Sequence, residues 1–158
     1  MFSQTTQYAI RAVVMLAYEK DGGPLGNTVL SARAQIPPSY LSKVLQGLAR
    51  AGVVESRRGV GGGFRLVKSA AEITLLDVVN AVEPLPRIKG CPLSLKSHAG
   101  MLCPLHARLD QAMAEVETVL SGATIADLIT EPSRPRPLLE TLAFLSGDDR
   151  PCPAESPG

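Results

Sequence analysis

The chain has 158 residues, of which 45% are hydrophobic and 20% charged, with a formal net charge of +1. This length and composition are typical of one globular domain with a substantial core. No apolar run approaches the ~18 residues that a membrane-spanning helix needs, and the first residues lack the pattern of a secretory signal peptide. The sequence therefore predicts a protein of the bacterial cytoplasm that has no membrane partner.

The small net charge conceals an uneven distribution. Residues 1–68 hold nine Lys and Arg against three Asp and Glu, a net of +6, whereas residues 69–158 hold seven against twelve, a net of −5. A basic region of this kind is the electrostatic footprint of contact with nucleic-acid phosphates. Because ordinary solvated surfaces are often lopsided in charge as well, the split favours a nucleic-acid partner only together with a motif in the same region.

Two helices are predicted in the N-terminal part of the chain. Residues 5–18 are almost continuously apolar, interrupted only by Arg11, and a helix that is apolar on most sides must be buried on most sides. Residues 28–35 form a second, shorter helix, for which Asn27 is the expected N-cap.

The stretch 37–68, PPSYLSKVLQGLARAGVVESRRGVGGGFRLVK, has two halves of different period. The second half contains two short strand-like runs, 53–56 and 64–67, which flank a tip of two arginines, a valine and four glycines and so indicate a β-hairpin. The first half predicts a helix that starts near Pro37 and Pro38 and ends at Gly52. Its apolar residues recur at the helical spacing of three and four: Leu41, Val44, Leu45 and Leu48.

Polar and basic side chains occupy the exposed face of this helix and the tip of the hairpin. Small polar and basic residues on a helix suit entry into the DNA major groove, and an arginine beside a bare glycine loop suits the minor groove or the phosphates. The order of helix, strand, basic tip and strand predicts a winged helix-turn-helix; the alternative is an ordinary solvated helix followed by an ordinary hairpin. The predicted DNA-contacting residues are Ser39, Tyr40, Ser42, Lys43, Gln46, Arg57, Arg58, Gly59 and Gly61.

The run YLSKVLQGLARAGVVESRRGVGGGFRL, together with YAIRA at residues 8–12, resembles the Rrf-two family of bacterial regulators. The resemblance extends over about residues 1–130 and is most specific in the wing. It implies a homodimeric repressor or activator that binds double-stranded DNA, and in many members, those like IscR and NsrR among them, an iron–sulfur cluster controls this binding. The expected fold is mainly α with a small β-hairpin: a winged helix-turn-helix domain over residues 1–83 plus a long dimerisation helix.

Two further helices follow the hairpin and are separated by an irregular loop. Residues 69–83 are predicted as a helix with Thr74 as an N-cap, and residues 84–102 as the loop, where the resemblance puts the cluster. Over residues 102–120, apolar residues recur at spacings of four and three, a heptad seam typical of a dimerisation helix. The seam consists of Leu102, His106, Leu109, Met113, Val116 and Leu120.

The C-terminal part is predicted to end in a short helix and a tail. Gly122 ends the long helix, and Thr124 caps a short helix over residues 125–129, which completes a dimerisation region of residues 103–130. Six of the thirteen prolines fall in residues 131–158, so this tail is expected to be mostly flexible. Within the tail, residues 138–145 are a candidate for a small amphipathic helix.

Three unevenly spaced cysteines do not describe a disulfide framework and are candidates for metal ligands, redox thiols or buried apolar residues. Cys103 and His106, at i and i+3, share one helix face, and thiolates and imidazoles are ligands of iron–sulfur clusters. By the resemblance, Cys91, Cys103 and His106 match three of the four ligand positions of IscR-like members. Ser97 occupies the remaining one, so His98 or a residue of the partner subunit is the candidate for the fourth ligand.

The resemblance therefore implies a [2Fe–2S] cluster that senses redox state, iron or nitric oxide. The alternative is a family member without a cluster, switched by cysteine thiol chemistry, zinc or a small molecule. An enzyme is a separate class, because a Cys and a His at this spacing suit a nucleophile and its base. No third orienting group or strand-to-helix phosphate loop accompanies them, so no enzymatic activity is predicted. A winged helix used only for protein contacts is the remaining alternative.

Overall fold

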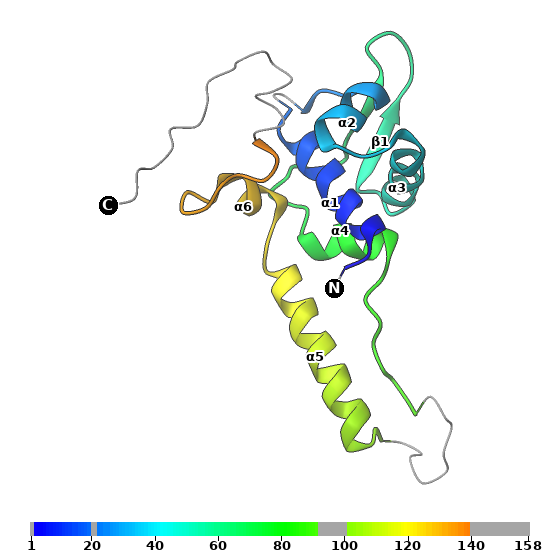
Figure 1. Ribbon diagram of the computed structural model, residues 1–158, viewed down its shortest axis with the longest axis vertical. Helices are drawn as coiled ribbons and strands as arrows, with labels where there is room; N and C mark the ends of the chain where they lie inside the picture. The colour runs from blue at the N-terminus through cyan, green and yellow to red at the C-terminus, as the bar shows by residue number, and fades with distance from the viewer. Residues whose placement is uncertain (1, 20–21, 92–100, 140–158) are drawn as a thin grey trace.

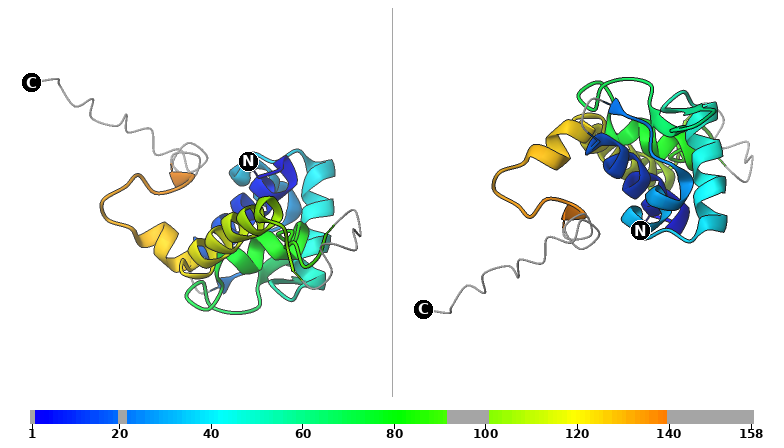
Figure 2. Two further views of the ribbon diagram at one scale, coloured as in Figure 1. Left: turned by 90° about the horizontal axis from the view of Figure 1, so that it is seen from below. Right: turned by 90° about the horizontal axis from the view of Figure 1, so that it is seen from above.

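The computed structural model of the protein describes residues 2–19, 22–91 and 101–139. Its elements within these ranges are α1 (Gln4–Ala17), α2 (Asn27–Ala34), α3 (Pro38–Arg50), β1 (Val54–Arg57), β2 (Gly63–Leu66), α4 (Leu75–Val82), α5 (Pro104–Ser121) and α6 (Ile125–Thr130). Helices α1 to α4 form a body, and α5 extends from it as an arm (Figure 1). In the views of Figures 1 and 2, α3 and the hairpin lie on the side of this body opposite to α6.

Helix α1 is the centre of the hydrophobic core. It packs against α2, α3, α4 and α6, and its apolar residues from Ala9 to Leu16 are mostly buried. Its start is fixed by Ser3, whose Oγ accepts a hydrogen bond from the Thr6 backbone N–H at 3.2 Å. The prediction that this helix is buried on most sides is thus confirmed.

Helices α2 and α3 form the helix-turn-helix. Leu41, Val44, Leu45 and Leu48 of α3 are all buried, as the helical period predicts, and each contributes roughly 1.5–3 kcal/mol by leaving water. The turn between the two helices passes through Gln35 in the left-handed conformation, at φ 51°. The prediction for Asn27 is wrong: Asn27 is the first residue of α2, and the N-cap is Gly26, which has no side chain for a capping hydrogen bond.

The hairpin is antiparallel, with Val54 opposite Leu66 and Arg57 opposite Gly63. Each strand is displaced by one residue from its predicted position, toward the tip. A third backbone segment joins the hairpin, because Leu25 and Phe64 exchange N–H···O hydrogen bonds of 2.9 and 2.8 Å. The wing is therefore attached to the segment that leads into α2 and is not held by its own strands alone.

Helices α4 and α6 begin side by side. Thr74 and Thr124 each form a capping box with the aspartate three residues later, and the two threonines pair as an antiparallel bridge. The capping box explains why α4 starts at Leu75 rather than at the predicted residue 69. The backbone bond from the Leu75 N–H to the Ala123 carbonyl, at 2.8 Å, holds the end of the arm against the body.

Helix α5 contacts the body mainly through its C-terminal half. Leu120 is buried in the protein's own core, so the prediction that it lies on a dimer seam is wrong. Among the described residues, no helix is long and apolar enough to cross a membrane. The structure describes the predicted tail only as far as residue 139. In this part, the Pro137 carbonyl accepts a hydrogen bond of 2.9 Å from the Tyr18 hydroxyl. The predicted helix at 138–145 lies almost entirely outside the described residues.

Candidate nucleic-acid interface and thiol–imidazole site

The predicted DNA-contacting residues of α3 share one exposed face of the helix. This face lies opposite the buried leucines, because residues at i, i+3, i+4 and i+7 of a helix lie on one side. An open groove of about 550 Å³ runs along it between α3, the start of α2 and β2. The residues exposed on this face are Ser39, Tyr40, Ser42, Lys43 and Gln46.

Two of these side chains already have partners within the protein. The Ser42 hydroxyl donates to the Pro38 carbonyl at 3.2 Å, which leaves its oxygen free to accept from a ligand. The Tyr40 ring packs edge-on against Tyr8 of α1, with ring centroids 5.7 Å apart. Arg11 lies over the Tyr8 ring at 5.7 Å from the centroid. Sequence reasoning missed this support for Tyr40, although Tyr8 and Arg11 belong to the run that carries the family resemblance.

The wing presents Arg57 and Arg58 on an exposed tip whose shape depends on glycine. Gly59 and Gly61 adopt positive φ values of 103° and 73°, and the Gly62 N–H donates to the Gly59 carbonyl at 2.9 Å. Arg65 pairs with Glu55 across the strands. Within the described parts of the chain neither tip arginine has an ion-pair partner, so both charges are available to an anionic ligand. Val60, fully exposed between Gly59 and Gly61, was not among the predicted residues.

Gly63 is required for a different reason, the close approach of two backbones. A Cβ atom on Gly63 would lie 2.2 Å from the Leu25 carbonyl oxygen, inside the bridge that attaches the wing to the body. Gly61 differs from Gly63 in this respect, because an added Cβ at Gly61 would meet no heavy atom within 4 Å. The two positions therefore test different properties of the wing.

The N-terminal end of α5, where Cys103 and His106 lie, is the end of the arm far from the body (Figure 1). Cys103 is the N-cap of α5, and its Sγ lies 3.3 Å from Nδ1 of His106, as the i, i+3 spacing predicts. Cys91 is half-buried at the end of the described segment that follows α4. Ser97 and His98 lie outside the described residues, as does Cys152.

The described residues bring together two of the predicted ligands and not three. Within ranges 2–19, 22–91 and 101–139, no group of three or more Cys, His, Asp or Glu side chains is arranged to hold a metal ion. The Cys103–His106 pair nevertheless has the right chemistry, because iron and zinc both accept a thiolate, which is a soft donor, and an imidazole nitrogen, which is a borderline one. The pair fits two positions of a cluster or metal site, and further donors must come from the connecting segment or another chain.

An arginine fork ties the segment after α4 to α5. Arg87 donates from Nε and Nη2 to the two carboxylate oxygens of Asp110, at 2.8 and 2.9 Å, and from Nη1 to Glu117 at 2.7 Å. The Ile88 backbone N–H adds a bond of 2.8 Å to Asp110. The Arg87 bonds and then the Ile88 bond lower the pKa of Asp110 to about 2. Sequence reasoning missed this contact, since it joins residues 23 positions apart in an irregular segment.

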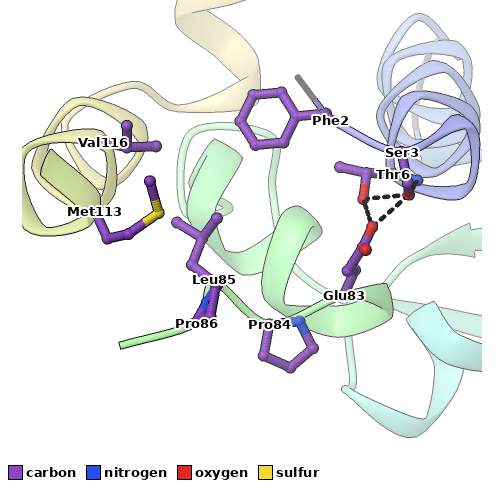
Figure 3. A pocket seen from close by; sticks show the side chains of 9 residues that line it. All are labelled: Phe2, Ser3, Thr6, Glu83, Pro84, Leu85, Pro86, Met113 and Val116. Carbon is purple, nitrogen blue, oxygen red and sulfur yellow. Dashed lines mark hydrogen bonds between the residues drawn. The ribbon is translucent and has the colours of Figure 1, made fainter. Parts of the chain in front are cut away.

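A cavity of about 350 Å³ lies where α1, the segment after α4 and α5 meet (Figure 3). On its α1 side, the Glu83 carboxylate accepts hydrogen bonds from the hydroxyls of Ser3 and Thr6, the latter at 2.9 Å. These bonds, that from Ser3 first, lower the pKa of Glu83 and keep it ionised at the positive end of α1. The remaining wall is apolar and consists of Phe2, Pro84, Leu85, Pro86, Met113 and Val116.

The outer face of α5 is apolar and uncovered within the described chain. Leu105, Leu109 and Val119 are 64%, 49% and 71% exposed. Their spacing of four and ten residues, with Ala112 and Val116 between, places them in one stripe along the helix. This stripe shares Leu109 and Val116 with the predicted seam. It is rotated from the face that carries Met113 and Leu120, which packs on the protein's own body, and Val116 lies at the boundary because it also lines the cavity.

The sequence is similar to known transcriptional regulators. A family model described as "Rrf2: Iron-dependent Transcriptional regulator" matches residues 2–131. Protein aau3 of Rhizobium meliloti (strain 1021) is 36% identical over 152 residues, which cover 94% of this chain and 95% of that protein. ORF2 of Azotobacter vinelandii, whose name describes an HTH-type transcriptional regulator, is 32% identical over 123 residues, covering 78% and 75% of the two chains.

Two solved structures share the fold. CymR (YrzC), the global cysteine regulator of B. subtilis, matches with a TM-score of 0.66 at 22% identity, over 81% of this chain and 95% of that one. IscR of T. potens matches with a TM-score of 0.68 at 22% identity, over 83% and 87%. At these identities the likeness concerns the fold alone.

The helix-turn-helix, the wing and the matched regulators together define a winged helix-turn-helix regulator of transcription, a DNA-binding protein and not an enzyme. Within this class, the chain belongs to the Rrf2 family, the Rrf-two family that its wing sequence resembles. The predicted family and fold class are confirmed.

Replacing Gly63 by alanine should detach the wing, because its Cβ would displace the Leu25 carbonyl. We expect DNA affinity to fall by at least about tenfold for Gly63→Ala, the loss of one good groove contact. Gly61→Ala, which meets only the cost of a left-handed conformation of roughly 1–2 kcal/mol, should lose less. Gel-shift titration at fixed salt measures both. Equal affinities for the two variants would contradict the attachment of the wing through Leu25.

Proposed function

We propose that this protein is a homodimeric, sequence-specific repressor or activator of transcription that acts in the bacterial cytoplasm. Its DNA affinity depends on the state of the site that contains Cys91, Cys103 and His106. The observation that carries the proposal is the shared surface of α3 and the wing, where exposed polar and basic side chains border one groove and two tip arginines lack ion-pair partners among the described residues. DNA is the ligand whose shape and charge fit this surface.

The α3 residues are assigned to the major groove and the wing residues to the minor groove or the phosphates. Lys43 and Gln46, one turn apart on the open groove, have the donors to read base edges. Ser39, Tyr40 and Ser42 lie at the N-terminal end of α3, which in helix-turn-helix proteins points toward the bases. At the tip, Arg57 and Arg58 supply charge, and Gly59 and Gly61 let the backbone approach closely.

The homodimer is proposed to form through the outer face of α5. An apolar stripe that repeats every three or four residues and is open to solvent suits packing against a second copy of the same helix. A two-fold dimer carries two recognition helices, so its DNA site consists of two related half-sites.

The sensor is proposed to be a [2Fe–2S] cluster responsive to redox state, iron or nitric oxide. Cys91, Cys103 and His106 would hold it, with the fourth ligand from His98 or the partner subunit. Such a cluster supplies reversible one-electron chemistry and a charge that changes when the cluster is lost. The family model carries the description "Iron-dependent", and one structure of the same fold is an IscR, which supports this assignment.

A second candidate is a switch without a cluster, based on cysteine thiol chemistry, zinc or a small molecule. The 3.3 Å contact between Cys103 Sγ and His106 Nδ1 favours thiol or zinc chemistry, because an adjacent imidazole can take up the thiol proton or share a metal ion. CymR, which has the same fold, is the global cysteine regulator of B. subtilis.

DNA recognition can be tested with two substitutions on the two parts of the interface. Arg58→Ala should weaken binding by about 1–3 kcal/mol and lower the salt dependence by about one counterion, because a phosphate or groove charge is lost. Lys43→Ala should change the preferred sequence more than the salt dependence. Fluorescence anisotropy over a salt series and selection from a random-site library measure these effects. If both variants behave as the parent does, α3 and the wing do not read DNA.

Dimerisation can be tested on α5 independently of DNA. Leu109→Glu puts a charge in the middle of the apolar stripe and should give monomers at micromolar concentration. Val67→Glu alters an apolar residue of similar exposure at the base of the hairpin and should remain dimeric. Analytical ultracentrifugation distinguishes the two species. A dimeric Leu109→Glu variant would refute the α5 interface.

The cluster can be tested by iron and sulfide analysis of protein purified without oxygen. Cys103→Ala should lose most of the iron, whereas Ser97→Cys should retain it longer than the parent, because a thiolate replaces a poor ligand. His98→Ala should lose iron faster only if His98 is the fourth ligand. Retention of full iron by Cys103→Ala would exclude a cluster at this site and leave the thiol or zinc switch.

A further inference from the structure

The described segment after α4, residues 83–91, lies along the arm and is fixed to it at one level. Its described contacts with α5 are centred on Asp110, which receives both prongs of the Arg87 fork and the Ile88 N–H. The third Arg87 bond goes to Glu117, two turns further along the same face of α5. A bidentate arginine–carboxylate pair fixes orientation as well as distance. The fork therefore sets the register of this segment along the helix.

This register brings the two ends of the candidate sensor site to one level. Cys91 follows Arg87 by four residues, which span at most about 13 Å when extended. Cys103 precedes Asp110 by seven helical residues, a rise of about 10 Å. Both stretches run from the fork toward the free end of α5 (Figure 1). The two lengths are comparable, so the fork allows Cys91 to lie near the level of Cys103 and His106, although the described side chains do not form one metal-binding group of three.

Stability alone does not account for this contact. The Arg87, Asp110 and Glu117 side chains are 35%, 20% and 37% exposed, and ion pairs at such exposure add little to folding free energy. The N-terminal half of α5 has no packing on the body comparable to that of Leu120. Among the described residues, the fork is thus the contact that joins residues 83–91 to the middle of α5.

The same segment leads directly back to the DNA-binding body. Four residues before Arg87, Glu83 is bonded to Ser3 and Thr6 at the start of α1, the central helix of the core (Figure 3). A shift of the segment at the fork would therefore act on α1 and on the end of α4. Cys91 is therefore connected to the body that carries α3 by a short stretch of chain, residues 83–91, and by the hydrogen bonds of Glu83 to Ser3 and Thr6.

We propose that Arg87 is the positioning residue of the thiol–imidazole site: its fork on Asp110 and Glu117 holds Cys91 level with Cys103 and His106 and transmits the state of that site to the DNA-binding domain. This inference rests on the proposed switch of DNA affinity, which it deepens by naming the connecting element.

The fork is insensitive to pH near neutrality. Asp110 has its folded-state pKa lowered from 3.8 to about 2, so its contribution to the folded state is complete above the unfolded value and is lost only as the pH falls through the folded value.

The test uses the full chain in a Cys152→Ser background, so that Cys91 and Cys103 supply the thiolates. Cobalt(II) alone is titrated into reduced protein, and thiolate-to-cobalt charge-transfer absorption reports site formation. Arg87→Ala should weaken cobalt binding about tenfold, the usual effect of losing a supporting contact. Arg87→Lys keeps the charge but not the fork and should also bind more weakly. Arg108→Ala removes another α5 arginine, whose side chain bonds to Gln111 of the same helix and not to the segment 83–91, and is the matched control.

A second readout separates positioning from a structural role. DNA affinity is measured for each variant without metal and with cobalt(II) bound. Thermal unfolding is measured for every variant. For Arg87→Ala we expect unchanged affinity when empty, unchanged unfolding, and a ratio of loaded to empty affinity that falls toward one. Parent-like cobalt affinity together with a parent-like ratio would overturn the proposal. A parent whose DNA affinity ignores loading would refute the proposed switch, while the cobalt titration would still decide the role of Arg87.

Discussion

The structure depends on the burial of α1 among four other helices. A helix that is apolar on nearly all sides gains stability only if every side is covered, and here α2, α3, α4 and α6 supply the cover. This requirement fixes the buried face of α3 against α1 and so determines which residues of α3 remain outside. The placement of the exposed face of α3, the proposed DNA-reading face, is a consequence of core packing, to which the contact of Tyr40 with Tyr8 of α1 adds.

Local signals in the sequence were sufficient for the elements of the DNA-binding domain. The period of Leu41, Val44, Leu45 and Leu48 predicted both the helix and its buried side, and the glycine-rich tip predicted the hairpin. One prediction that failed, Asn27 as a cap, concerned a helix start at which glycine and asparagine are adjacent and both acceptable. Boundaries of this kind depend on tertiary hydrogen bonds, such as those between Leu25 and Phe64, which no local pattern encodes.

The arm was predicted less completely, because its features arise from contacts between distant residues. The heptad pattern found a long helix, but Leu120 turned out to face the body and Leu105 and Val119 the solvent, a distinction that period alone does not make. The pairing of Cys103 with His106 followed from their spacing in the sequence. The hydrogen bonds of Arg87 to Asp110 and of Thr6 to Glu83 could not be predicted in this way. Those contacts join an irregular segment to two helices, and the spacing of apolar residues does not predict the contacts of an irregular segment.

The paired helix starts at Thr74 and Thr124 have a consequence for how proteins of this architecture diversify. The chain leaves the body at the end of α4 and returns, through the bond between Leu75 and Ala123, to the beginning of the same helix. Everything between residues 83 and 123 is therefore an excursion anchored at both ends of one short helix. Such an excursion can be lengthened, shortened or given different ligands while its anchor points stay where they are. The proposed switch site and the proposed DNA-reading surface therefore belong to parts of the chain that can change separately.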